Sequence, residues 1–571
     1  MSGIRHAERS GRSAQEVVAE ARERISAAED PGIFLSLVDQ PQELPPFDAE
    51  RTPLWGLPFA IKDNIDVAGL PTTAACPTFA YEPRVSATAV QRLIAAGAVP
   101  VGKTNMDQFA TGLTGTRTPY PIPRNPVAPA IIPGGSSSGS AVAVARGIVP
   151  FALGTDTAGS GRVPAAMNGI VGLKPTRGVV STLGVFPACR TLDTLSIFAR
   201  TVGEAWTVFE TIAAFDVADA YSRPLRPARP GPVAPKIRIG VPLKAQRVFH
   251  GDSAAEAAFD AHLRKLGTIA QLVELDAGAF LTAGEMLYGG PWLAERVAAF
   301  GKFAAEHPDA VHPVTAEVLK GASGLTAADA FNAMYELAEL RRKSEAVWPL
   351  VDALAVPTVP TAPTVTSVLK DPIRLNAQLS LYTNFVNLLD LCALAVPGEA
   401  RRDGIPAGIT LIAPAGRDAD LASMGMAFLG ELAPQPGLRR DAVPLVAVGA
   451  HMSGLPLNGQ LRDTGASFVA ATQTAPLYRL YALPGDPPRP GMLRVDPSRG
   501  NSISVEVWMM PIEALGAFLA NVPAPLSIGT IALADGSFAK GFLAEAEGIS
   551  GALDISQYGG WRAFLEQPAS P

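Results

Sequence analysis

Cysteine is scarce in this sequence of 571 residues, which contains only Cys76, Cys189 and Cys392, far apart and without a CxxC pair. A disulfide framework and a cysteine-ligated zinc site are therefore not expected, and we predict three buried free thiols and no metal. The sequence also lacks a run of 18 apolar residues, and its N-terminal residues show no basic segment followed by an apolar one. We therefore expect a cytoplasmic protein with no membrane partner.

An excess of positive charge is absent as well, because 53 acidic residues outnumber 47 lysines and arginines, for a net charge of −6. This balance argues against nucleic acid as the main partner. Histidine is missing between residues 7 and 249. If the chemistry lies in that interval, we expect its general base to be another type of residue.

The order of apolar and turn-forming residues predicts an α/β protein. Between about residues 86 and 200, apolar strands alternate with alanine-rich helical stretches and glycine-rich turns. A proline-rich stretch at 223–235 is predicted to be a surface loop, and residues 252–350 are predicted to be mostly helical, with Pro291 as the first residue of one helix. We assign residues 1–435 to one large domain.

A second domain is predicted after the proline-containing segment 433–444. Residues 436–444 are predicted to be a linker and residues 445–571 a small α+β domain. The strand-like runs of this domain lie at 445–448, 477–483 and 503–509, and a short helix is predicted near 511–520. The length of the chain, which exceeds that of a single hydrophobic core, is consistent with this division.

One motif is rejected on its context. Residues 97–104 (GAVPVGKT) match the phosphate-loop pattern GxxxxGK[ST] letter for letter. A phosphate loop follows a strand and opens a helix, so that backbone N–H groups converge on the phosphate. Here Gly97 ends a predicted helix at 87–96, and residues 98–101 resemble a strand that contains a proline. We therefore do not predict nucleotide binding.

A lysine in the segment GLPFAIKDN, residues 56–64, has a chemical reason to be there. Lys62 follows an apolar strand, and a lysine that acts as a base must be neutral, which requires its pKa to fall by about 2–3 units from about 10.4. Burial produces such a fall, and arginine cannot replace lysine in this role. Taken alone, Lys62 is also compatible with a structural lysine in a salt bridge.

Two serine-containing loops complete the set. Ser136 lies in PGGSSSGS, ahead of a helical stretch, and alone it indicates a flexible turn or an anion-holding helix start. Ser160 lies in GTDTAGSGR, where Asp156 and Arg162 are placed to pair across the turn. The backbone N–H groups of the small residues in this turn are predicted to point inward together as an oxyanion hole. These residues are Thr157, Ala158, Gly159 and Ser160.

Taken together, the three segments closely resemble the amidase signature family, and the resemblance extends over about residues 10–435. It implies a mixed β-sheet flanked by helices and a Ser-Ser-Lys triad that needs no cofactor. Ser160 is implied as the nucleophile, Ser136 as a bridging serine with a cis peptide bond, and Lys62 as the general base. The base takes the proton of the nucleophile through the bridging hydroxyl, and water later cleaves the acyl-enzyme.

The residues around Ser160 depart from most of that family and look like its allophanate hydrolase branch, since they read Ala-Gly-Ser-Gly-Arg. The segment YGGPWLAER also resembles this branch, in which Tyr288 and Arg296 hold the substrate carboxylate. A packed aromatic ring and a helix-surface arginine are the alternative. A glycine loop at 109–117 is a weaker candidate for lining the pocket, through Gly112.

The C-terminal domain resembles the tail of long allophanate hydrolases, which has a fold related to γ-glutamyl cyclotransferases. The resemblance rests on GAHMSGLPLN at 449–458 and YRLYALPG at 478–485. In that family the tail is implicated in the decarboxylation of the first product, N-carboxycarbamate. His451 is the residue that the resemblance brings forward, although a structural histidine at a strand end and a tail that serves assembly alone remain open.

The resemblance as a whole implies hydrolysis of allophanate, a small anionic amide, to ammonia and carbon dioxide. It also implies a homodimer and a functional association with urea carboxylase or biuret hydrolase. A broad aliphatic or aryl amidase and the glutaminase subunit of an amidotransferase are alternatives within enzymes, and the tail argues against the latter. A non-catalytic scaffold with an amidase fold is the alternative outside enzymes, but all three triad positions hold the required residues.

Overall fold

The computed structural model describes residues 13–225, 227–434 and 441–567. The described chain forms two compact units. Unit 1 contains the described residues up to Pro227 together with 239–268 and 272–431, and unit 2 contains 228–238, 269–271 and the described residues from Leu432 onward. Part of the stretch predicted as a surface loop therefore belongs to the second unit. Of the predicted linker 436–444, residues 436–440 lie outside the described residues, and a strand begins at Ala442.

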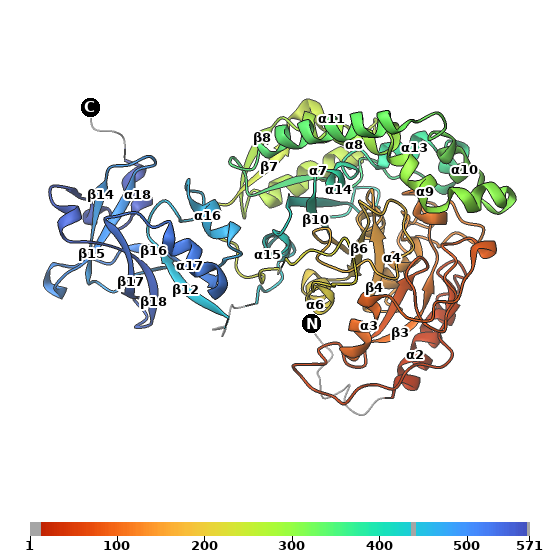
Figure 1. Cartoon of the computed structure of the whole chain (residues 1–571), viewed down its shortest axis with the longest axis horizontal. Helices are drawn as coiled ribbons and strands as arrows, with labels where there is room; N and C mark the ends of the chain where they lie inside the picture. Colours follow the sequence, from red (N-terminus) through yellow and green to blue (C-terminus); the bar gives the residue numbers. More distant parts are fainter. Residues whose placement is uncertain (1–12, 226, 435–440, 568–571) are drawn as a thin grey trace. The chain divides into compact units, whose positions relative to one another are not determined.

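Unit 1 is built on one mixed sheet of 11 strands, in the order β1-β3-β2-β4-β6-β5-β10-β11-β9-β7-β8 (Figure 1). The strands are β1 (Phe34–Leu37), β2 (Pro58–Lys62), β3 (Val99–Thr104), β4 (Phe151–Asp156), β5 (Val171–Lys174), β6 (Thr194–Ala199), β7 (Arg238–Pro242), β8 (Gln271–Leu275), β9 (Ala353–Pro357), β10 (Leu391–Pro397) and β11 (Gly408–Pro414). The predicted mixed sheet is thus confirmed.

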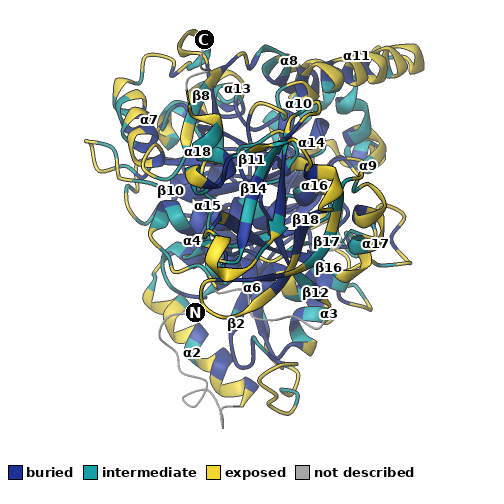
Figure 2. Cartoon of the chain, turned by 90° about the vertical axis from the view of Figure 1, so that its left-hand side faces the viewer, coloured by how far each residue is buried: buried dark blue, intermediate teal, exposed yellow. Residues whose placement is uncertain are grey.

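The centre of this sheet places the ends of two important strands together. β2 runs parallel to both β3 and β4, so the carboxyl ends of all three strands meet at one edge. β3 and β4 are buried along their whole length, as Figure 2 shows by the dark strands inside the unit. Strands that are buried on both faces read as continuous apolar runs, which is the pattern of Phe151 to Leu153.

Helices surround the sheet, and several carry one buried and one exposed face, as in α2 and α11 (Figure 2). They are α2 (Ala14–Ala27), α3 (Thr88–Ala95), α4 (Ser138–Ala145), α5 (Val163–Met167), α6 (Val202–Ile212), α7 (Ser253–Leu266), α8 (Gly278–Gly289), α9 (Trp292–Glu306), α10 (Pro313–Lys320), α11 (Ala327–Glu345), α12 (Val365–Lys370), α13 (Arg374–Leu379), α14 (Phe385–Leu388) and α15 (Asp418–Leu429). Residues 252–350 are mostly helical, as predicted, with β8 as an exception. Pro291 precedes α9 as its N-cap instead of being its first residue.

Unit 2 contains a five-stranded sheet in the order β13-β16-β12-β18-β17 and a three-stranded sheet in the order β15-β14-β19. Its strands are β12 (Ala442–Ala447), β13 (Ser467–Gln473), β14 (Tyr478–Leu483), β15 (Arg489–Arg494), β16 (Ser504–Pro511), β17 (Leu526–Ala532), β18 (Phe538–Ala544) and β19 (Leu553–Asp554). Its helices are α16 (Asn458–Asp463), α17 (Ile512–Ala520) and α18 (Trp561–Leu565). The small α+β character is confirmed, and the likeness to γ-glutamyl cyclotransferases stays a prediction.

The phosphate-loop pattern has the structure that its context predicted. Gly97 follows α3, and Lys103 and Thr104 are the last residues of β3, so no helix begins after the motif. The three cysteines are free and buried. Among the described helices, none combines the length and the apolar character needed to cross a membrane.

Candidate active site

Lys62 is the last residue of β2 and is fully buried. Its Nζ lies 2.7 Å from the hydroxyl oxygens of both Ser136 and Thr155. Burial lowers the pKa of Lys62 to about 7, although the carboxylates of Asp107, Asp193 and Asp156 act in the opposite direction. Near neutral pH a large fraction of this amine is therefore uncharged and able to accept a proton.

Ser136 precedes α4 in a loop that only glycine can form. A Cβ on Gly135 would lie 2.0 Å from Asp107 Oδ2 and 2.4 Å from the amide nitrogen of Gly115. The Gly135–Ser136 peptide bond is cis, as the family resemblance implies. Ser136 Oγ lies 2.8 Å from Ser160 Oγ. The loop thus places one hydroxyl between the amine of Lys62 and the hydroxyl of Ser160.

The turn that carries Ser160 begins where β4 ends. The carboxylate of Asp156 accepts two hydrogen bonds from the Arg162 guanidinium, both 2.9 Å long, and a third of 3.0 Å from the Gly161 amide. Burial tends to raise the pKa of Asp156, but the Arg162 charge outweighs it and holds the pKa below its ordinary value. The predicted pairing across the turn is confirmed, and it fixes the shape of the turn at neutral pH.

The backbone N–H groups of residues 157–160 are buried and donate to no other described residue. Unpaired buried N–H groups are rare because each costs the free energy of a lost hydrogen bond. Gly159 has a φ of 150°, and a Cβ there would lie 2.5 Å from Thr383 Oγ1. This backbone is therefore free to donate to a negatively charged oxygen beside Ser160.

Side chains from two other segments hold the turn from behind. Asn387 Nδ2 donates to the carbonyl oxygens of Asp156 and Thr157, at 2.8 and 2.9 Å. The Thr157 hydroxyl donates to the carboxylate of Asp193, which also accepts a 2.8 Å hydrogen bond from the Ala188 amide. Burial raises the pKa of Asp193 to about 6. Sequence reasoning missed Asn387 and Asp193, because neither belongs to a motif.

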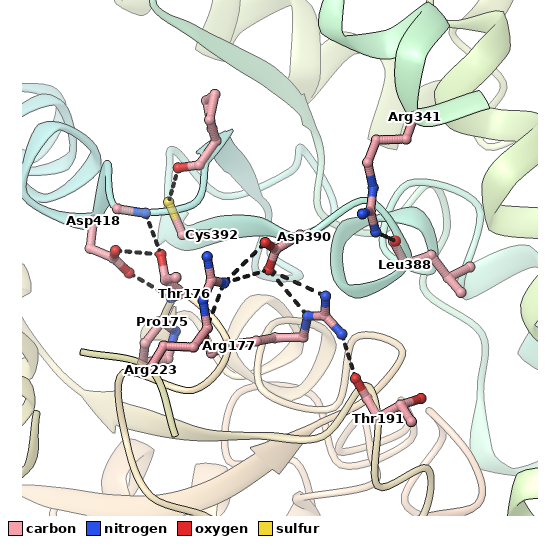
Figure 3. Close-up of polar contacts among 12 residues, drawn as sticks. Pro175, Thr176, Arg177, Thr191, Arg223, Arg341, Leu388, Asp390, Cys392 and Asp418 are labelled. Atoms are coloured by element: carbon pink, nitrogen blue, oxygen red, sulfur yellow. Dashed lines mark hydrogen bonds and ion pairs between the residues drawn. The ribbon is translucent and has the colours of Figure 1, made fainter. Parts of the chain in front are cut away.

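The segment that follows α14 is fixed by a polar network, shown in Figure 3. Both carboxylate oxygens of Asp390 lie 3.0 Å from Arg223 Nη1, and Asp390 Oδ1 lies 3.3 Å from Arg177 Nε. Arg177 also donates to the carbonyl oxygen of Thr191. The helix that carries Asn387 and the loop that carries Asp193 are thus tied to the same pair of arginines.

Tyr288 and Arg296 lie together, on α8 and α9. Arg296 is fully buried, its Nη2 donates to Tyr288 Oη at 3.3 Å, and its guanidinium carbon lies 5.1 Å from the centre of the tyrosine ring. Arg296 Nη1 donates to Thr111 Oγ1 at 3.2 Å, and Arg296 Nε has no hydrogen-bond partner. A buried guanidinium without a carboxylate partner in hydrogen-bond contact is suited to bind an anion.

Arg117 is a second buried guanidinium near the first, and sequence reasoning did not single it out. It donates to the Thr111 carbonyl oxygen at 2.9 Å, and its Nε also lacks a partner. Gly112 packs against this arginine, since a Cβ there would lie 2.8 Å from Asp107 Oδ2 and 3.0 Å from Arg117 Cδ. Gly112 therefore gives the loop room beside two charged side chains, and it is not among the residues that line the cavity next to Arg117.

His451 belongs to unit 2 and borders a cavity of about 240 Å³ there. Its Nε2 lies 3.0 Å from Gln460 Oε1, and its ring stacks on Phe542 with 4.9 Å between the centroids. Burial lowers the pKa of His451. The cavity is also lined by Arg489, so a neutral imidazole and a cationic side chain border the same space.

Comparison with known families agrees with this division of the chain. Residues 38–422 match the model of the family described as Amidase. Residues 443–566 match the model described as Allophanate hydrolase C-terminal domain.

Individual relatives give the same result. Urea amidolyase of Saccharomyces cerevisiae is 41% identical over 549 residues, which are 90% of this chain but 30% of the relative, so the chain spans about a third of that protein. The crystallised allophanate hydrolase of Kluyveromyces lactis is 37% identical with a TM-score of 0.75, and 98% of this chain covers 97% of that one. The glutamyl-tRNA(Gln) amidotransferase of Symbiobacterium thermophilum contains a polypeptide that is 34% identical over 67% of this chain and 84% of its own length. The chain therefore belongs to the amidase family of amide-hydrolysing enzymes, and it carries in addition an allophanate hydrolase C-terminal domain.

Proposed function

We propose that this protein hydrolyses allophanate to ammonia and carbon dioxide, with Ser160 as nucleophile, Ser136 as bridging residue and Lys62 as general base. The observation that carries the proposal is the continuous chain of short contacts, 2.7 Å from Lys62 to Ser136 and 2.8 Å from Ser136 to Ser160. A pKa of about 7 for Lys62 supports its role as a base. No cofactor takes part in this scheme.

In the proposed reaction, neutral Lys62 accepts the proton of Ser136 while Ser136 accepts that of Ser160. Ser160 Oγ attacks the amide carbonyl carbon, and the developing oxyanion is stabilised by the N–H groups of residues 157–160, each of which is worth about 3–4 kcal/mol when well aligned. The same relay, run backwards, protonates the leaving nitrogen as ammonia. Water then cleaves the acyl-enzyme with Lys62 again as the base.

The choice of substrate is supported by the buried guanidinium of Arg296. Allophanate carries a carboxylate at one end and an amide at the other, so an arginine that binds the carboxylate orients the carbonyl toward the nucleophile. Tyr288, which accepts a hydrogen bond from Arg296, is proposed to share this contact. A neutral amide such as acetamide has no group for this interaction.

The proposal is tested by ammonia release from allophanate, biuret, glutamine and acetamide. We expect allophanate to be preferred, and Arg296→Ala to raise KM for allophanate by about 100-fold or more, since loss of a buried charge pair costs several kcal/mol. The same change should leave acetamide hydrolysis within about threefold. Equal rates on acetamide and allophanate in the unchanged protein would contradict the proposed substrate, and equal losses in the variant would make Arg296 structural.

For the tail we propose decarboxylation of N-carboxycarbamate, supported by the cavity that His451 shares with Arg489. A cationic side chain is suited to hold the carboxylate of this intermediate. His451→Ala in the full chain should leave release of the first ammonia unchanged and delay that of carbon dioxide. Unchanged carbon dioxide release would leave the tail with a role in assembly alone.

The source of the substrate is also a proposal. The name of the yeast relative suggests a link to urea breakdown, and we propose a functional association with urea carboxylase or with a biuret hydrolase. Coupled assays with each candidate enzyme would separate the two. A homodimer is proposed as well, and sedimentation equilibrium would decide between one and two copies.

A further inference from the structure

A cavity of about 370 Å³ opens beside the anion-binding arginines of unit 1. One wall comes from α8 and contains Gly284 and Tyr288, and the opposite wall comes from residues 373–384. Arg117 also lines it. Because Tyr288 accepts a hydrogen bond from Arg296, this cavity is continuous with the place proposed for the substrate carboxylate.

The wall opposite Tyr288 presents an unpartnered polar atom. Asn384 lines the cavity, its exposed fraction is 6%, and its Oδ1 has no hydrogen-bond partner. A buried carbonyl oxygen without a donor costs about 1–3 kcal/mol, unless a ligand supplies that donor. The amide is therefore prepared to accept a hydrogen bond from something that enters the cavity.

The orientation of this amide is fixed by its neighbour. Ser380 Oγ donates its single proton to the Ala377 carbonyl oxygen at 2.9 Å, so toward Asn384 it can only accept. Asn384 must then turn its NH₂ group to Ser380, at 3.1 Å. Rotation of the amide by 180° would place two acceptors against each other, so the oxygen is the atom left for a ligand.

Other buried side-chain amide oxygens also lack a partner, and their location differs. They belong to Asn64, Asn168 and Asn387. None of these three residues lines the cavity beside Tyr288. Asn384 is thus the one whose missing partner coincides with a space large enough for a small substrate.

Asn384 also adjoins the catalytic turn. Its neighbour Thr383 would lie 2.5 Å from a Cβ on Gly159, and the Thr383 carbonyl oxygen accepts a 3.1 Å hydrogen bond from Arg162 Nη1. The acceptor therefore lies in a segment that contacts the turn of Ser160, in a cavity that it shares with Tyr288. In allophanate, the group between the carboxylate and the carbonyl is an N–H.

We propose that Asn384 is a specificity-determining residue whose side-chain oxygen accepts the hydrogen bond of the substrate N–H that lies between the carboxylate and the scissile carbonyl. This inference rests on the proposed function. A site built around such an acceptor discriminates against an isostere that lacks the donor, because the acceptor is then left unpaired. The informative isostere is malonamate, in which CH₂ replaces this N–H and both ends of the molecule are kept.

The test compares kcat/KM for allophanate and malonamate in the unchanged protein and in Asn384→Leu, which has a similar shape and no acceptor. We expect kcat/KM for allophanate to fall about 10- to 100-fold and that for malonamate to change less than about threefold, so that the preference collapses. The thermal midpoint should not fall, because an unpaired buried oxygen is replaced by an apolar group. Ser380→Ala, which frees the amide to rotate, should give a smaller loss of the same preference.

Equal losses on both substrates in Asn384→Leu would overturn the inference and leave the proposed function standing. A lower thermal midpoint combined with equal losses would assign Asn384 a structural role. Absence of allophanate hydrolysis in the unchanged protein would instead overturn the proposed function, so the two failures are distinguishable.

Discussion

Two buried lysines lie on neighbouring parallel strands of the same sheet, and their surroundings differ. Lys62 ends β2 and Lys103 lies near the end of β3, where it pairs in register with Ile61. Both side chains are fully buried. The ammonium of Lys103 lies 3.4 Å from the carboxylate of Asp63, whereas Lys62 has two hydroxyl groups as its hydrogen-bond partners.

The partner, and not the burial, separates a structural lysine from a base. Burial lowers the pKa of both lysines, and in Lys103 the adjacent carboxylate of Asp63 opposes the shift. A carboxylate in contact keeps the proton on the amine, while hydroxyl groups can interact with either form. This explains why a phosphate-loop pattern supplied a salt bridge and an unremarked strand end supplied the proposed base.

The largest effect is expected at Lys62. Lys62→Met should lower kcat by about 10³- to 10⁴-fold, because no neutral amine remains to accept the proton of Ser136. Circular dichroism and the thermal midpoint should show a folded protein. Lys62→Arg should be as inactive, since arginine stays charged, and activity in either variant within tenfold of the original would break the comparison.

At Lys103 the expected loss is in stability. Lys103→Met leaves Asp63 buried without its counter-charge, which costs about 3–5 kcal/mol of the free energy of unfolding. Denaturant titration measures this loss. The protein that remains folded should keep kcat within about tenfold, and a larger loss of kcat at unchanged stability would show that Lys103 takes part in the chemistry.

A smaller effect is expected at Asp193, whose charge raises the pKa of Lys62. Asp193→Asn removes this charge, so the rising limb of the pH–activity profile should move to lower pH. The loss of the hydrogen bond from Thr157 should also lower kcat about tenfold. Thr157→Val is the matched control, because it removes the hydrogen bond and keeps the charge. A limb that shifts equally in both variants would contradict the electrostatic explanation.

The sequence predicts those parts of the site that lie in local patterns. The strand end at Lys62 and the small-residue turn at Ser160 are set by neighbouring residues, and the salt bridge between Asp156 and Arg162 spans a single turn. Asn384 and Asp193 act from segments far along the chain, and the sheet order brings them to the turn. Their spacing in the sequence carries no signal of that contact.

Boundaries were also less predictable than elements. Unit 2 takes in residues 228–238, which sequence reasoning placed in a surface loop of the other domain, because chain order does not determine which core a loop packs on. β12 begins at Ala442, three residues before the predicted strand, since Val443 and Pro444 continue the pairing with β16.

The most direct test of a neutral lysine as the base is the rate at which a fluorophosphonate labels Ser160, measured between about pH 5.5 and pH 9. This reagent does not titrate in that range, so the rate reports the proton relay. Because the form that accepts a proton exists above the pKa of Lys62, the rate should rise with pH and level off, with a midpoint of about 7. A rate that is independent of pH, or a Lys62→Met variant that is labelled as fast as the original, would contradict the account.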